Sequence, residues 1–164
     1  MKYILPLVIL LLVSCTKSPY TNDPIDETDY PVAIISEVLS NNASTITDTE
    51  GDYDDYIEIR NPGDTLIDLS GFGLSDDNED VVFFFPTPTP LMPDSVLLVW
   101  CDGEPLEGDL HADFRISASG EWVGLFLPSS AILDSVTLPE LPDDTAFQRD
   151  DSLGWYAGVA TPGE

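Results

Sequence analysis

Short apolar segments, separated by residues that favour turns, make up most of the chain after residue 30. The 14 prolines and 11 glycines fall largely between these segments rather than inside them. No such segment repeats its apolar residues at the 3.6-residue spacing of an amphipathic helix. Short apolar segments with turn residues between them are typical of an all-β sandwich. The sequence therefore predicts an all-β fold, with one domain over residues 31–164.

The predicted strands are runs of apolar, β-branched or aromatic side chains that end at a turn. They are Val32–Leu39, Tyr56–Arg60, Thr65–Leu69, Val81–Phe85, Val96–Cys101, Phe114–Ser117, Trp122–Leu127, Ile132–Leu138 and Ala146–Gln148. The segment from Pro86 to Pro93 is predicted to be a connection between two strands. A chain of 164 residues has room for one such domain and short additional segments.

Residues 1–14 have the pattern of an export signal. Lys2 precedes an apolar run that ends at Val13. That run is shorter than the about 20 residues that span a bilayer, but it matches the core of a signal peptide. It continues into Leu12-Val13-Ser14-Cys15, which resembles a bacterial lipobox. We therefore expect a lipoprotein signal peptide that is removed before Cys15.

Lipid on Cys15 would anchor the mature chain to the bacterial cell envelope. The next residue is Thr16 rather than Asp, which favours the outer membrane under the sorting rule of enteric bacteria. Residues 15–30 would then form the lipidated cysteine and an acidic, flexible tether. The alternatives are a cleaved signal without lipid and an uncleaved anchor.

The charge balance limits the classes of partner. The chain has 5 Lys and Arg against 31 Asp and Glu, with a net charge of −26. Such a protein repels phosphate backbones, so the sequence argues against nucleic-acid binding. Divalent cations and basic partners fit this charge, and so does a role in solubility alone.

Seven short motifs occur in a fixed order along the chain. They are Ile35-Ser36-Glu37-Val38, Gly51–Gly63, Ile67–Asp76, Phe85-Pro86, His111–Glu121, Asp134-Ser135-Val136 and Thr161-Pro162-Gly163. In this order they resemble the lamin tail domain found in secreted and surface proteins of bacteria, over about Val32 to Gly163. The resemblance implies an immunoglobulin-like β-sandwich. The sequence departs from the family at Tyr56, where Trp is usual, and at Cys101, where a small residue is usual.

The densest group of acidic residues lies between residues 48 and 55. Acids alternating around a glycine are typical of calcium-binding loops, in which oxygen atoms surround the ion. The candidate calcium ligands are Asp48, Glu50, Asp52, Asp54 and Asp55. A second acidic loop, residues 75–80, could add oxygens if it lies at the same end of the sandwich. The alternative is a solvated acidic loop that binds no metal.

Catalytic residues are not predicted. The chain has one histidine, His111, and no sequence pattern of a nucleophile elbow, a zinc protease or a phosphate-binding loop. The family resemblance implies a structural role for His111. Cys101 lies in an apolar run and is expected to be a buried, unreactive thiol.

Two side chains within predicted strands have further expected roles. Glu37 is expected to pair with Arg60 or Arg115, because a buried carboxylate needs a partner. The three residues Phe83 to Phe85 cannot all face inward in one strand. Phe84 is therefore a possible contact for a partner.

The sequence thus predicts a non-catalytic cell-envelope lipoprotein whose sandwich acts as a binding or adhesion module. Its partners would be the membrane, through the lipid on Cys15, and a protein or a glycan. One alternative is a calcium-stabilised structural spacer in a surface assembly. Another is an accessory module of a secreted hydrolase or nuclease, because lamin tail domains often accompany such enzymes.

Overall fold

A computed structural model describes residues 32–150, 152 and 154–164. The predicted signal peptide, the lipidated Cys15 and the tether lie outside the described residues. Contacts within the chain group Pro31–Glu164 into one compact unit. Within the described part, no helix has both the length and the apolar character needed to cross a membrane.

The described residues form eleven β-strands. They are β1 (Ile34–Leu39), β2 (Tyr56–Arg60), β3 (Ile67–Asp68), β4 (Gly73–Ser75), β5 (Phe83–Phe84), β6 (Pro90–Leu91), β7 (Val96–Trp100), β8 (Trp122–Phe126), β9 (Ile132–Thr137), β10 (Thr145–Arg149) and β11 (Trp155–Val159). One sheet has the order β11-β10-β1-β2-β7, and another has the order β5-β4-β8-β9. A third, two-stranded sheet pairs β3 with β6.

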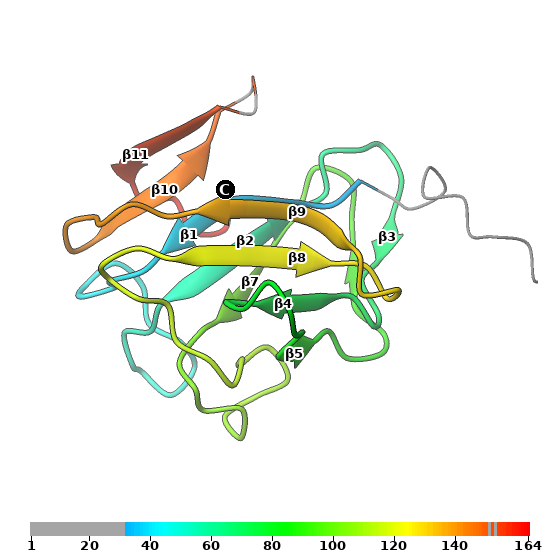
Figure 1. Ribbon diagram of the computed structural model, residues 1–164, viewed down its shortest axis with the longest axis horizontal. Helices are drawn as coiled ribbons and strands as arrows, with labels where there is room; N and C mark the ends of the chain where they lie inside the picture. The colour runs from blue at the N-terminus through cyan, green and yellow to red at the C-terminus, as the bar shows by residue number, and fades with distance from the viewer. Residues whose placement is uncertain (1–31, 151, 153) are drawn as a thin grey trace, which may run out of the picture. The chain divides into compact units, whose positions relative to one another are not determined.

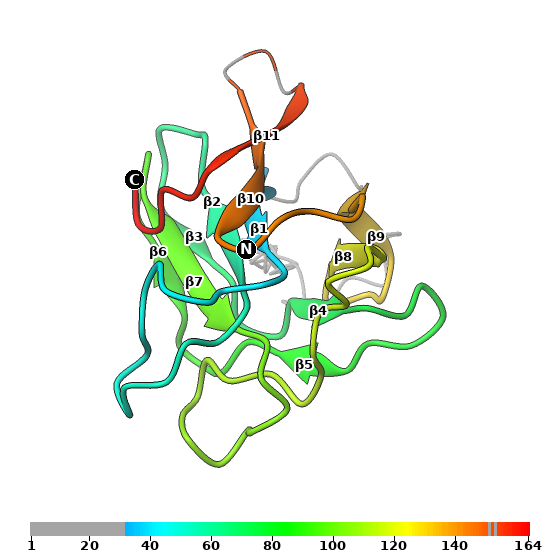
Figure 2. The same ribbon diagram turned by 90° about the vertical axis from the view of Figure 1, so that its left-hand side faces the viewer.

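The two larger sheets pack against each other, as both ribbon views show (Figures 1 and 2). Ile57, Ile59 and Val99 of the five-stranded sheet are fully buried, as are Leu74 and Leu125 of the four-stranded sheet. Full burial of each such side chain stabilises the fold by about 1.5–3 kcal/mol. The all-β sandwich predicted from the sequence is confirmed.

The outer face of β2 is also buried. Tyr56 and Glu58 alternate with the core isoleucines of the strand, so their side chains lie on the opposite face of the sheet. The Tyr56 hydroxyl donates a hydrogen bond to Glu37 of β1. The tail after β11 covers this face, because Gly163 N donates to Glu58 Oε2 over 2.8 Å.

Glu37 holds the same tail. Both of its carboxylate oxygens accept the Thr161 backbone N–H at 3.0 Å, and Oε2 also accepts the Thr161 hydroxyl at 2.9 Å. The expected pairing of Glu37 with arginine is wrong. Arg115 lies 3.8 Å from Glu104 instead, and the partners of Glu37 are a tyrosine and the tail.

Some predicted strands differ from those observed. Phe114–Ser117 forms no strand, although Phe114 and Ile116 are buried, and its one bridge is Asp102 with Arg115. The predicted connection from Pro86 to Pro93 contains β6. The sequence does not predict β11, because its residues Trp155–Val159 show no alternation of apolar and polar side chains, and most of them are exposed.

Candidate metal centre

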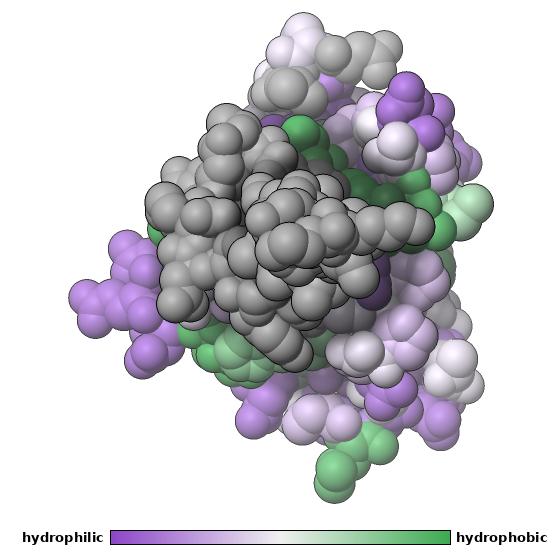
Figure 3. Space-filling model, turned by 90° about the vertical axis from the view of Figure 1, so that its right-hand side faces the viewer, coloured by the Kyte–Doolittle hydropathy of each residue, from purple (hydrophilic) through white to green (hydrophobic). Residues whose placement is uncertain are grey.

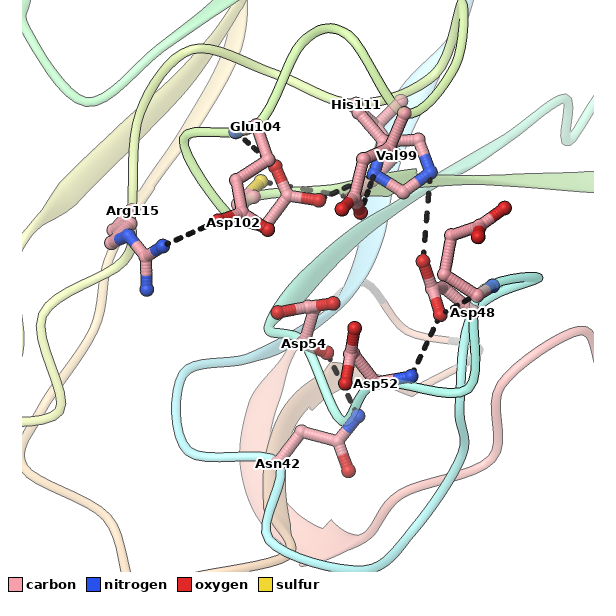
Figure 4. A network of polar contacts seen from close by, with 12 residues as sticks. Asn42, Asp48, Asp52, Asp54, Val99, Asp102, Glu104, His111 and Arg115 are labelled. Atoms are coloured by element: carbon pink, nitrogen blue, oxygen red, sulfur yellow. Dashed lines mark hydrogen bonds and ion pairs between the residues drawn. The ribbon is translucent and has the colours of Figure 1, made fainter.

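Two acidic loops meet where β2 begins and β7 ends. The two strands pair antiparallel with Tyr56 opposite Trp100. The pairing continues past the strand ends, because Cys101 N donates to Asp55 O over 2.8 Å. The loop before β2, residues 48–55, therefore adjoins the loop after β7, residues 102–111 (Figure 4).

Asp48 organises the first loop. Its Oδ1 accepts the backbone N–H groups of Glu50, Gly51 and Asp52 at 2.8–3.0 Å. Gly51 adopts a φ of +98°, which an L side chain rarely tolerates. Burial acts to raise the pKa of Asp48, but the three N–H donors outweigh it and hold the pKa below its ordinary value. Asp48 is therefore a carboxylate at neutral pH, and its side chain is completely buried.

His111 organises the second loop together with Asp102. Trp100 N donates to Leu110 O at 2.9 Å and Ala112 N to Trp100 O at 2.8 Å, which fixes the backbone on both sides of His111. His111 Nδ1 is hydrogen-bonded to Asp102 Oδ2. Because a carboxylate can only accept, Nδ1 carries the proton of this bond. The other ring nitrogen, Nε2, then faces Asp48, whose Oδ2 lies 4.0 Å away (Figure 4).

Three buried carboxylate oxygens converge at this place. Asp48 Oδ2, Asp54 Oδ2 and Glu107 Oε2 are inaccessible to solvent and have no hydrogen-bond partner among the residues that the structure describes. A buried carboxylate oxygen without a partner is costly unless it coordinates a cation. These three atoms are therefore the strongest indication of a ligand in the described part of the chain.

The possible metal ligands form two overlapping groups. One contains Asp48, Glu107 and His111, and the other contains Asp54, Asp102 and Glu107. Within each group, one ligand atom per residue lies within 4.8 Å of the others. Two oxygens of one calcium ion, each about 2.3–2.6 Å from it, are at most about 5 Å apart. The spacing therefore allows one cation to contact all members of a group.

The carboxylates of the cluster repel one another. Burial raises the pKa of Asp54, and the negative charges of Asp102 and Asp48 raise it further. Burial likewise raises the pKa of Glu107, with a further rise from Glu104 and Asp48. A divalent cation among them would replace this repulsion with attraction.

The structure brings together two of the five predicted calcium ligands, Asp48 and Asp54. Glu50 and Asp52 are exposed and belong to neither group. Asp55 accepts the Asn42 backbone N–H at 3.0 Å instead, and burial raises its pKa to about 6. No acid of residues 76–80 joins the groups found among the described residues.

Sequence reasoning missed Asp102 and Glu107 as candidate ligands and assigned His111 only a structural role. A signal for them was present, because the residues after Cys101 form a second acidic segment directly behind a predicted strand. Antiparallel pairing of that strand with Tyr56–Arg60 places the two acidic segments side by side. The pairing of these two strands could not be read from the sequence.

A small pocket lies beside the cluster. It has a volume of about 330 Å³, and its lining includes Asp54, Asp55, Asp102 and Arg115. Arg115 is itself exposed and lies 3.8 Å from Glu104. The pocket therefore adjoins the cluster at Asp54 and Asp102, and its lining does not include Asp48, Glu107 or His111.

The other predicted site residues lie elsewhere. Phe84 is 58% exposed, whereas Phe83 and Phe85 are buried. It lines a pocket of about 490 Å³ with Glu79, Asp80 and others. Cys101 is buried, as predicted, and burial raises the pKa of its thiol well above the ordinary value.

The antiparallel sandwich defines the class of this protein as a β-sandwich domain with acidic loops at one end. The family model Lamin Tail Domain matches residues 28–140. The chain therefore belongs to the lamin tail domain family, and its fold is an immunoglobulin-like β-sandwich. A comparison with curated proteins gives no match. Strands β10 and β11 follow the matched residues, yet they extend the same five-stranded sheet.

Proposed function

We propose that this chain is a non-catalytic binding module of the bacterial cell envelope, anchored in the outer membrane through lipid on Cys15. The family supports the modular part, because lamin tail domains are immunoglobulin-like structural domains. The partner, a protein or a glycan, and the contact at Phe84 stay predictions.

On the face shown in Figure 3, hydrophilic residues occupy much of the described surface, and hydrophobic residues gather in separate small areas. Such a surface suits a domain that works in water.

The burial of His111 and Cys101 supports a non-catalytic role, because these two side chains are the best suited to acid–base or nucleophilic chemistry. His111 is 6% exposed, and its Nδ1 is committed to Asp102. Cys101 is buried and has a raised thiol pKa, so little reactive thiolate exists at neutral pH.

A calcium ion among the loops is the second part of the proposal. The observation that carries it is the set of buried, unpartnered oxygens of Asp48, Asp54 and Glu107. The all-oxygen group of Asp54, Asp102 and Glu107 has the donor atoms that calcium prefers. Bound there, calcium would join the loop before β2 to the loop after β7 and so hold one end of the sandwich in a fixed shape for binding.

We expect calcium to raise the melting temperature of the full chain, purified in detergent and stripped of metal with EDTA. A ligand that binds only the folded state stabilises it by about 2.7 kcal/mol at 100 times its Kd. This corresponds to a rise in Tm of about 5 °C or more for a domain of this size. Thermal unfolding followed by tryptophan fluorescence, with and without calcium, measures the shift.

Two matched variants identify the site. Asp54→Asn removes a charged oxygen from the cluster and should abolish most of the calcium shift. Asp52→Asn removes the same charge from an exposed residue of the same loop and should keep the shift. No shift in the unmodified chain, or equal loss in both variants, contradicts the calcium site.

Lipid attachment is tested at Cys15. We expect Cys15→Ser to move the protein from the membrane fraction to the soluble fraction when it is expressed in a bacterium that processes lipoproteins. Cys101→Ala, at the other cysteine, should leave it with the membrane. Mass spectrometry of the N-terminal peptide measures the lipid directly, and an unmodified Cys15 in the membrane fraction contradicts the anchor.

A further inference from the structure

The group of Asp48, Glu107 and His111 differs in kind from the all-oxygen group. It includes an imidazole nitrogen, which suits zinc and other late first-row transition metals, whereas calcium prefers oxygen ligands. His111 is the one histidine of the chain and is almost fully buried. Its position beside two unpartnered carboxylate oxygens therefore calls for an explanation that calcium alone does not provide.

The imidazole is oriented as a metal ligand would be. A ligating histidine commonly donates its second ring N–H to a carboxylate, which fixes the tautomer and the direction of the ring. Asp102 accepts from His111 Nδ1 in this way, and its other oxygen is held by Glu104 N at 2.7 Å. The lone pair of Nε2 is thereby directed toward the side of the ring where Asp48 lies.

Asp48 completes the pair of donors. Its Oδ1 is saturated by three backbone N–H groups, whereas its buried Oδ2 has no hydrogen-bond partner and lies 4.0 Å from His111 Nε2. That distance is too long for a hydrogen bond. Two ligands of one tetrahedral zinc ion, each about 2.0–2.2 Å from the metal, are about 3.3–3.6 Å apart. The two donors are therefore slightly farther apart than in a loaded tetrahedral site, and a small shift of either side chain would bring them to a shared metal ion.

We infer that His111 Nε2 and Asp48 bind a late first-row transition-metal ion of the zinc class, with Asp102 as the positioning residue of the imidazole. Glu107 belongs to the same group, but its Oε2 lies 3.9 Å from His111 Nδ1, so it would turn toward Nε2 to act as the third ligand. The inference extends the cation site of the proposed function, with which it shares Glu107. The fourth ligand of the ion would be water or a group of a partner, since three protein ligands leave one position of a tetrahedral site open.

The single histidine makes a direct test possible. The full chain is labelled with ¹⁵N-histidine, purified in detergent, stripped of metal and titrated with zinc chloride at neutral pH. We expect the Nε2 resonance to shift on zinc binding, while calcium chloride leaves Nε2 without a ligation shift. This measurement needs no substitution, so it does not depend on the folding of a variant.

Isothermal titration of variants locates the second ligand. Asp48→Asn keeps the Oδ1 acceptor of the loop and removes the anionic Oδ2, so zinc should bind at least tenfold more weakly. Asp52→Asn, which changes an exposed acid of the same loop, should leave the zinc affinity within about twofold. Equal losses in the two variants would indicate a general charge effect and would overturn the inference.

The possible results separate this inference from the proposed function. A calcium shift in Tm without any zinc effect on Nε2 overturns the inference and leaves the calcium proposal standing. A zinc effect on Nε2 without a calcium shift supports the inference and removes calcium from the proposed function. If neither ion binds, both fail.

Discussion

Replacing Glu37 with alanine is expected to lower the free energy of unfolding by about 3 kcal/mol or more. The carboxylate accepts the Tyr56 hydroxyl and both the backbone N–H and the hydroxyl of Thr161. Without it, the buried Tyr56 hydroxyl on the interior strand β2 and the donors of the tail lose their acceptor. Each unsatisfied buried group costs about 1–3 kcal/mol. Urea unfolding of the full chain in detergent, followed by tryptophan fluorescence, measures the loss.

The control for this substitution is Glu79→Ala, which changes an exposed glutamate in a loop and should alter stability by less than about 0.5 kcal/mol. A second variant, lacking residues 161–164, removes the donors rather than the acceptor. Because both changes break the contacts between Glu37 and Thr161, the combined variant should lose less stability than the sum of the two. Additive losses would show that Glu37 does not hold the tail.

This tail contact joins the end of the chain to residues matched by the family model, whose match ends at residue 140. The backbone N–H of Thr161 reaches a residue of β1 that is 124 positions earlier in the chain. Strand β10 pairs directly with β1, opposite Glu37 and Val38. The last 24 residues therefore complete the five-stranded sheet and cover its outer face, and a shorter chain would expose buried carboxylates.

Much of the fold could be predicted from the sequence, because β1, β2, β7, β8 and β9 are rich in apolar and β-branched residues and are bounded by turn residues. The strands that escaped prediction are short or exposed. A two-residue strand such as β6 is too short to show an alternating pattern. In β11, most side chains are exposed, so no buried apolar face marks the strand. At Phe114 and Ile116 the apolar alternation predicts a strand that does not form, because these buried side chains pack in the core without a ladder of backbone hydrogen bonds.

Only one of the two loops that form the candidate metal centre could be predicted from the sequence. The acidic segment from Asp48 to Asp55 is visible as a local pattern, and two of its residues reach the cluster. Asp102, Glu107 and His111 join it through the pairing of β2 with β7, which is a long-range feature. Local patterns identify candidate ligands within one loop, whereas a site built from two loops depends on strand order.

Replacing Leu125 with alanine is expected to destabilise the domain by about 2–5 kcal/mol. Leu125 is fully buried in β8, between Leu74 of β4 and Asp134 of β9. The substitution removes its transfer free energy and leaves a cavity between the sheets that the surrounding strands can only partly close. Chemical unfolding of the full chain in detergent measures the loss, which should appear as a lower midpoint with an unchanged slope.

Leu106→Ala is the matched control, because the same atoms are removed from a side chain that is 99% exposed. It should change stability by less than about 0.5 kcal/mol, and comparable losses in the two variants would contradict the packing of β8 in the core. Leu125→Ala should also keep the calcium-induced rise in Tm. Leu125 belongs to the four-stranded sheet, whereas the cluster lies on loops joined to β2 and β7. Stability of the sandwich and binding at its acidic end should therefore vary independently.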